Sequence, residues 1–288
     1  MTSMSSGGST ANRPTVYRRA RAVARHLGIG RLRDRVRASV HKSAYWTAVP
    51  PRRLKDLDPQ RELPANAFAL TFDDGPDPVV TPRLLEVLAA HSAPATFFLC
   101  GLAAKRHPAV VRDILAAGHA IGGHTWDHRH PMVRGLSVAE WQRQVDDTHK
   151  VLEDISGAPV RWFRPPRGIT DRHTWSALRR QRLTTVLWSV DGRDCTLRDP
   201  EAVANGVLDR LGPGDIVLLH DANAGYLFST TRPDYGADGN QESTVEATGH
   251  ILRVAADRAL LPISLAMLQG GTMPRSGRLR IPYLAASK

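Results

Sequence analysis

Aspartates and histidines suited to acid–base or metal chemistry recur along this 288-residue sequence. Asp73 and Asp74 are adjacent, and His124 and His128 are four residues apart, which on a helical turn would place both rings on one side. Two imidazoles and one carboxylate, with positions left for water and substrate, are typical ligands of a hydrolytic divalent ion. The histidine spacing alone is equally compatible with two solvated side chains. The acidic pair favours a metal site that includes Asp73 or Asp74.

These residues follow short apolar segments that alternate with helical patterns. The helical pattern at 138–155 is the clearest, because apolar residues recur every three or four positions, Ser137 and Glu140 form a capping box, and Gly157 can end the helix. The predicted strands are 67–72, 95–100, 119–122, 160–163, 184–189, 215–220 and 261–265.

Strict alternation of strands and helices implies parallel strands with right-handed crossovers. We therefore predict an α/β fold, a distorted (β/α) barrel with about seven parallel strands. An open doubly wound sheet is the alternative, but the first strand is not followed by the GxGxxG turn of many such sheets.

A barrel of this kind gathers its catalytic groups just after the carboxyl ends of the strands. The sequence meets this requirement at five strand ends, so we expect acids, imidazoles and a guanidinium to converge there. The segments are Asp73-Asp74-Gly75, His124 to His128, Arg164-Pro165-Pro166, Asp191 with Asp194, and His220-Asp221.

Composition excludes several classes of protein. Hydrophobic residues make up 42% of the chain, and no apolar run approaches the roughly 18 residues of a membrane span. The two cysteines, Cys100 and Cys195, are too few for a disulfide scaffold. We expect a globular monomer without a transmembrane segment.

The positive charge is concentrated at one end of the chain. Residues 1–60 hold 13 Lys and Arg against 3 Asp and Glu, whereas the net charge of the whole chain is +11. We predict a basic N-terminal extension at 1–60, disordered in its first part, and a catalytic domain at 61–288. The extension is expected to be a solvated arm; the alternative is contact with an anionic membrane or wall polymer. No nucleic-acid partner is expected.

Five segments resemble the ordered motifs of the polysaccharide deacetylase family, which is carbohydrate esterase family 4 or the NodB homology domain. The resemblance covers roughly residues 67–268 and implies that 61–288 is such a domain with a distorted barrel fold. The segments are TFDDGPD (71–77), GHAIGGHTWDH (118–128), FRPPRG (163–168), WSVDGRDC (188–195) and IVLLHD (216–221).

The resemblance implies a role for each residue of the site. Asp74, His124 and His128 would bind the metal, which in the family is usually zinc and in some members cobalt or another divalent ion. The metal would polarise the acetamide carbonyl and acidify water, Asp73 would remove the proton of that water, and His220 would protonate the departing amine.

Two further residues would hold the catalytic pair in the correct state. Arg164 resembles the residue that orients the base Asp73, and Asp194 resembles the acid that favours protonated His220. Asp191 is the alternative partner of the histidine. The residues expected to line the substrate groove are Pro165, Pro166, Arg167, Trp188 and Leu218.

The sequence departs from the family motifs at two positions. Arg167 replaces the usual tyrosine of the third motif, and Cys195 replaces the usual tryptophan of the fourth. The tyrosine acts through its backbone N–H, which arginine also has, so the chemistry should survive. The cation of Arg167 and the small side chain of Cys195 suggest that the substrate is an anionic or a smaller glycan.

The expected function is a metal-dependent hydrolase that removes acetyl groups from the amides of N-acetylated sugars, in a polysaccharide or a glycoside. The alternatives are an O-acetyl glycan esterase, such as an acetylxylan esterase, and a non-catalytic glycan-binding module. No signal peptide is legible, so the protein is expected to be cytoplasmic or atypically exported, the bacterial envelope being where a polymer substrate would lie.

Overall fold

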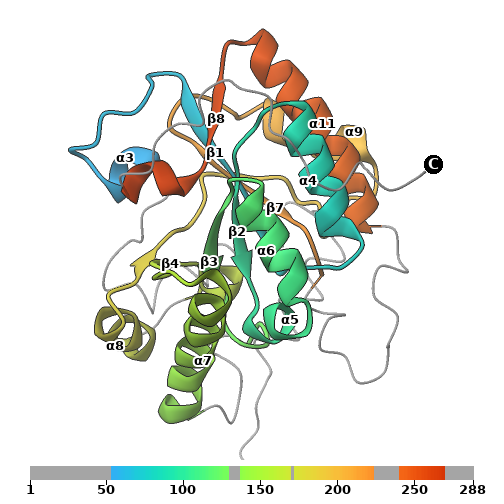
Figure 1. The fold of residues 1–288 in the computed structure, drawn as a ribbon. Coiled ribbons are helices and arrows are strands. Elements are labelled where there is room, and N and C mark those ends of the chain that lie inside the picture. Colours follow the sequence, from blue (N-terminus) through green and yellow to red (C-terminus); the bar gives the residue numbers. More distant parts are fainter. Residues whose placement is uncertain (1–52, 130–136, 170–171, 224–239, 270–288) are drawn as a thin grey trace, which may run out of the picture. The chain divides into compact units, whose positions relative to one another are not determined.

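A computed structural model describes the protein over residues 53–129, 137–169, 172–223 and 240–269 (Figure 1). The strands are β1 Ala67–Asp73, β2 Thr96–Leu99, β3 Ala120–Gly123, β4 Trp162–Phe163, β5 Thr184–Thr185, β6 Val190–Asp191, β7 Ile216–His220 and β8 Leu261–Ile263. The helices are α3 Leu54–Leu57, α4 Val80–Ala90, α5 Gly101–Arg106, α6 Pro108–Ala116, α7 Val138–Ser156, α8 Arg172–Arg180, α9 Pro200–Leu208 and α11 Asn240–Asp257, with short 3-10 turns η1 Pro166–Gly168 and η2 Leu265–Gln269. No helix in these ranges is long and apolar enough to cross a membrane.

The strands form one parallel sheet in the order β5-β4-β3-β2-β1-β7-β6, and β8 pairs with the first residues of β1. The two ends of this path, β5 and β6, are consecutive in the chain. Between them, Val186 donates its N–H to Phe163 O and Ser189 donates its N–H to Ile216 O, so the segment 186–189 joins β4 to β7. The sheet therefore curls into a ring, and the predicted distorted (β/α) barrel is confirmed.

The predicted strand at 184–189 is replaced by two short strands, β5 and β6, which raises the strand count from about seven to eight. One straight strand cannot pair with β4 at its start and with β7 at its end. The backbone between Thr185 and Val190 must bend to pass from one neighbour to the other, which interrupts the regular ladder.

Helices cover the outside of the sheet. Along this belt α9 packs against α11, α11 against α4, α4 against α6, and α6 against α7 (Figure 1). Alternate residues of β1 face this helical layer and join its apolar cluster, and these residues are Phe68, Leu70 and Phe72. Because both sides of a barrel strand are covered, all seven residues of β1 are buried.

The other residues of β1 face the inside of the barrel. Ala67 and Ala69 belong to the inner apolar cluster, and the period of two places Thr71 and Asp73 on the same face. Asp73, the last residue of β1, is 3% exposed, so its side chain lies inside the barrel at the carboxyl end of the strands.

The long helix α7 begins and ends as predicted. Ser137 Oγ accepts from Glu140 N at 3.2 Å, the Glu140 carboxylate accepts from Ser137 N at 2.8 Å, and Gly157 ends the helix with φ 67°. The buried face of α7 packs beside β3, so the helix supports the loop that follows this strand.

The predicted extension at 1–60 lies outside the described residues up to position 52. Leu54, in α3, is 2% exposed, packs in the inner apolar cluster with Ile216, and donates its N–H to Gly214 O. Arg53 pairs with Asp215 at 3.1 Å. Residues from 53 onward thus contribute to the folded body, and the boundary of the extension stays a prediction.

Candidate active site

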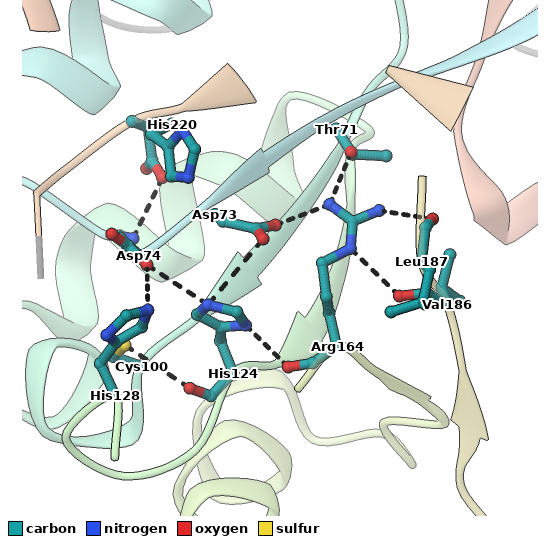
Figure 2. A network of polar contacts seen from close by, with 12 residues as sticks. Thr71, Asp73, Asp74, Cys100, His124, His128, Arg164, Val186, Leu187 and His220 are labelled. Atoms are coloured by element: carbon teal, nitrogen blue, oxygen red, sulfur yellow. Dashed lines mark hydrogen bonds and ion pairs between the residues drawn. The ribbon is translucent and has the colours of Figure 1, made fainter. Parts of the chain in front are cut away.

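One carboxylate and two imidazoles converge beyond the ends of β1 and β3 (Figure 2). Asp74 Oδ1 lies 3.3 Å from His124 Nε2 and 3.3 Å from His128 Nε2. Asp73 Oδ2 is farther from His124 Nε2, at 3.8 Å. Of the two aspartates left open by the spacing, Asp74 therefore lies closer to the two histidines.

A sharp change of backbone direction gives the adjacent aspartates different orientations. Asp74 has φ 80°, a left-handed conformation directly after the extended residue Asp73. The next residue must be glycine, because a Cβ at Gly75 would overlap the carboxylate of Asp221. Asp73 consequently faces the barrel interior, whereas Asp74 faces the histidines.

The two histidines lie on a loop, so the expected helical turn across 124–128 is wrong. Thr125 has φ 66° and His128 has φ 61°, and these left-handed conformations are incompatible with a right-handed helix. The ring centroids of His124 and His128 are nevertheless 5.1 Å apart, so both rings still reach Asp74.

The donor set fits a divalent metal ion. His124 Nδ1 lies 2.7 Å from the carbonyl oxygen of Arg164 and must donate its proton there, which leaves the lone pair of Nε2 directed at Asp74. Two atoms that each bind one tetrahedral ion at about 2.0–2.1 Å are about 3.3 Å apart, the separation found here.

The charge states of these ligands also fit a cation. Burial lowers the pKa of His128 to about 4, so its ring is neutral at neutral pH. Burial raises the pKa of Asp74, but the nearby rings of His128, His124 and His220 outweigh burial and hold that pKa well below its usual range. An anionic oxygen with neutral imidazoles is the form that metal binding requires.

On the other side of Asp73 lies a buried guanidinium. Arg164 is 0% exposed, and its Nη1 donates to Asp73 Oδ1 at 2.7 Å and to Thr71 Oγ1 at 2.8 Å. The carbonyls of Val186 and Leu187 accept further hydrogen bonds from it, at 3.1 and 3.3 Å. A buried charge is tolerated only when it is paired and hydrogen-bonded in this way, so Asp73 is fixed in one orientation.

His220 and Asp194 form the second ion pair of the site. Asp194 Oδ1 is 2.8 Å from His220 Nδ1, and its Oδ2 accepts from His220 N at 2.7 Å and from Thr244 Oγ1 at 2.8 Å. Burial opposes a charge on His220, but Asp194 and Cys195 together outweigh burial and hold the pKa of the ring well above its usual value. The alternative partner, Asp191, instead accepts from Arg193 N at 2.8 Å.

The predicted groove residues differ in exposure. Pro165 and Pro166 are buried, Leu218 is 4% exposed, and Trp188 is half-buried against the inner apolar cluster. Arg167 is exposed and has φ 59°. In the view of Figure 2, Arg164 and His220 lie on opposite sides of the aspartate pair.

Three polar residues that received no role from the sequence support the site. Thr71 accepts from Arg164, Asp221 accepts from Gly75 N at 3.1 Å, and Gln144 Oε1 accepts from two backbone N–H groups of the histidine loop, at 3.0 and 3.2 Å. The period of two along β1 could have revealed Thr71, because it shares a face with the base. Gln144 lies on α7, the next helix along the chain, and no periodic pattern places it beside the histidine loop.

Asp221 is buried and joins three elements. Its Oδ2 is 2.6 Å from Thr81 Oγ1 in α4, its Oδ1 binds Gly75 after β1, and its own N–H donates to Asp73 O at 3.2 Å. Burial raises the pKa of Asp221 to about 7.

Comparison with known proteins gives consistent matches. A family model described as polysaccharide deacetylase matches residues 60–186. A chitooligosaccharide deacetylase of Azorhizobium caulinodans is 43% identical over 157 residues, which are 54% of this chain and 74% of that protein. A chitooligosaccharide deacetylase of Sinorhizobium fredii is 34% identical over 218 residues, 74% of this chain and 98% of that protein.

Solved structures agree with the sequence matches. The peptidoglycan deacetylase PdaC from Bacillus subtilis has a TM-score of 0.59 and 28% sequence identity, covering 72% of this chain and 91% of that one. The similarity therefore extends over most of the described barrel.

Proposed function

The chain belongs to the polysaccharide deacetylase family, and we propose that it hydrolyses the acetamide group of an N-acetylated glycan with a divalent ion held by Asp74, His124 and His128. The observation that carries this proposal is the convergence of three groups at one end of the barrel. They are the metal donor set, a carboxylate paired with a buried arginine, and an imidazole paired with a buried carboxylate.

A divalent ion bound there supplies Lewis-acid polarisation of the acetyl carbonyl and lowers the pKa of water. We assign zinc, because two neutral imidazoles and one carboxylate are a common catalytic zinc set that leaves room for water and substrate. His124 is held in the required tautomer by Arg164 O, which reduces the reorganisation needed on binding.

Asp73 acts as the general base. Its Oδ1 is occupied by Arg164, whereas its Oδ2 faces the metal donor set, 3.8 Å from His124 Nε2. The ion pair with Arg164 fixes the orientation of Asp73 and thereby the oxygen that accepts the proton of the attacking water.

His220 acts as the general acid. Because Asp194 favours the imidazolium, the ring carries a proton at neutral pH that it can deliver to the departing nitrogen. An amine is a poor leaving group unless it is protonated, so this donor matters more for amides than for activated esters.

The substrate class follows from the relatives and from one exposed side chain. The relatives are named for chitooligosaccharide and peptidoglycan, both of which carry N-acetylated sugars. Exposed Arg167 adds a cation beside the predicted groove and favours a glycan with an anionic substituent. A peptidoglycan fragment would combine both features, and the cell envelope is where such a substrate occurs.

The proposal is tested by acetate release from chitin oligomers, peptidoglycan fragments and acetylxylan, with and without a chelator. We expect chelator-sensitive release from the N-acetylated substrates. Release from acetylxylan alone would instead identify an O-acetyl esterase, and no release from any of them would contradict the proposed activity.

Two variants separate metal binding from proton transfer. Asp74→Ala should lose the metal, measured by elemental analysis, and all activity. His220→Ala should keep the metal and lose turnover of amides by about 100-fold or more, with a smaller loss on activated esters. Stoichiometric zinc in Asp74→Ala, or equal losses on amides and esters in His220→Ala, would contradict the respective role.

A further inference from the structure

Three different kinds of metal-binding side chain meet at His220, the proposed general acid. A ring nitrogen of His220, the sulfur of Cys195 and a carboxylate oxygen of Asp194 all lie within 4.8 Å of one another. The Asp194 side chain is 1% exposed and that of His220 17%, whereas Cys195 is exposed, so the cluster is accessible from the cysteine side. Within the described ranges, the proposed zinc ligands are the only other set of this kind.

A tight turn after β6 creates this cluster. Asp191 Oδ1 accepts from the N–H of Arg193, which has φ 57°, and the chain then turns, with Thr196 and Leu197 both donating their N–H groups to Arg193 O. Because β6 runs parallel to β7, with Asp191 beside Leu218, Asp194 and Cys195 lie beside His220 at the end of β7. The cluster is therefore fixed by backbone geometry and by the hydrogen bonds of Asp194.

The donor chemistry differs from that of the first metal set. Thiolate sulfur and imidazole nitrogen together favour zinc and cadmium over hard cations such as magnesium. The tryptophan that usually occupies position 195 in the motif has only an N–H donor and offers no ligand atom. A thiol at position 195 thus adds a donor that the motif otherwise lacks.

We propose that Asp194, Cys195 and His220 form a second metal site, which binds a thiophilic divalent cation and inhibits the enzyme. On binding, the thiol of Cys195 and Nε2 of the His220 imidazolium each release a proton to solvent. The ion takes up the lone pairs of Sγ and Nε2 beside an oxygen of Asp194, and Nδ1 keeps the proton that it shares with Asp194. His220 then has no Nε2 proton to deliver to the departing nitrogen. The inhibitory effect rests on the proposed function, whereas the metal site itself does not.

Cadmium binding tests the site without reference to activity. The full-length protein, preloaded with one equivalent of zinc, is titrated with Cd²⁺ while the ultraviolet charge-transfer band of a cadmium–thiolate bond is recorded. We expect about one equivalent of cadmium to bind with this band in the wild type. The first set contains no sulfur, so exchange of its zinc for cadmium gives no such band.

The chain has two cysteines, which makes the assignment direct. Cys195→Ser should abolish the band, whereas the matched control Cys100→Ala, at a 0% exposed position, should retain it. A band that persists in Cys195→Ser, or that is absent from the wild type, would overturn the proposal.

Inhibition by excess metal tests the functional consequence. Each variant is compared with its own activity at one equivalent of zinc, and further zinc or magnesium is then added. Zinc should inhibit the wild type, magnesium should not, and Cys195→Ser should raise the half-inhibiting zinc concentration by about tenfold or more, since loss of even an outer partner of a metal site costs about 10–100-fold in affinity. An unchanged half-inhibiting concentration refutes the inhibitory role.

The two proposals can fail separately. A chain without deacetylase activity that still shows the cadmium–thiolate band contradicts the proposed function and supports the second metal site. A chain with chelator-sensitive deacetylase activity and no band does the reverse.

Discussion

At the scale of single residues, the site consists of functional groups whose state is set by one neighbour. The carbonyl of Arg164 selects the tautomer of His124, its guanidinium orients Asp73, and Asp194 stabilises the charge of His220. Each of these partners is buried, so each interaction is stronger than it would be in water.

Replacing Asp194 with asparagine should shift the pH profile of the enzyme. Asparagine cannot stabilise the imidazolium, so the pKa of His220 should fall from its raised value. A general acid works in its protonated form, and activity is lost as pH rises through its pKa. The alkaline limb of the kcat/KM profile should therefore move to lower pH by about one unit or more, with an activity loss of about tenfold or more at neutral pH.

Asp191→Asn is the matched control for this experiment, because Asp191 binds the backbone of Arg193 in the same turn. Its alkaline limb should stay where it is in the wild type. An Asp194→Asn profile that coincides with the wild-type profile would exclude Asp194 as the residue that sets the protonation of His220.

At the scale of secondary structure elements, the site depends on contacts that hold strand ends together. Asp221 after β7 binds the turn after β1 and the first turn of α4, so the predicted base and acid are kept at a fixed separation. Gln144 of α7 holds the histidine loop against this helix, because its side-chain oxygen accepts from two backbone N–H groups of the loop.

Asp221→Asn should change how stability depends on pH. The pKa of Asp221 is raised from 3.8 in the unfolded reference to about 7, so its protonated form stabilises the fold below about pH 4, and this contribution is lost as pH rises to 7. Asparagine stays neutral, and its amide can still bind Gly75 N and Thr81 Oγ1. Relative to the wild type, the free energy of unfolding of the variant should rise by roughly 2 kcal/mol between pH 5 and pH 7.

Urea unfolding at both pH values, with chelator present throughout, measures this difference. Asp113→Asn, an exposed change on α6, serves as the control and should follow the wild type. A constant difference between Asp221→Asn and the wild type across this pH range would be inconsistent with a protonated Asp221 in the folded protein.

The sequence predicts those parts of the site that follow from regular elements. Asp73, Asp74 and His220 were expected together because parallel strands end at one edge. The two histidines were expected at the same edge, but the conformation of their loop was not, since Thr125 and His128 adopt left-handed conformations that their residue types do not signal. The break between Thr185 and Val190 was also missed, because an apolar run reads as one strand when its two pairing partners are unknown.

At the scale of the whole molecule, the proposed ion would link the end of β1 to the loop after β3. An ion that binds the folded but not the unfolded chain stabilises the fold by about 2.7 kcal/mol at 100 times its dissociation constant. For a body of this size, chelation should lower Tm by about 5–10 °C, and added zinc should restore it.

Differential scanning calorimetry measures this shift, and Asp74→Ala provides the control, because its Tm should not respond to chelator or zinc. A wild-type Tm that is insensitive to chelation would contradict metal binding by the folded chain. If the Tm of Asp74→Ala responded as strongly as that of the wild type, the ion would bind at another site.

Arg164 contacts the two halves of the proposed machinery with different atoms. Its main-chain oxygen orients a histidine of the donor set, and its guanidinium holds the carboxylate of the proposed base, Asp73. Every amino acid at this position retains the first contact, whereas only arginine makes the second in this form. A single codon change at this position should therefore abolish the proposed hydrolysis while the metal donor set and the predicted groove stay in place, which gives a chain of this kind a short evolutionary path from enzyme to glycan receptor.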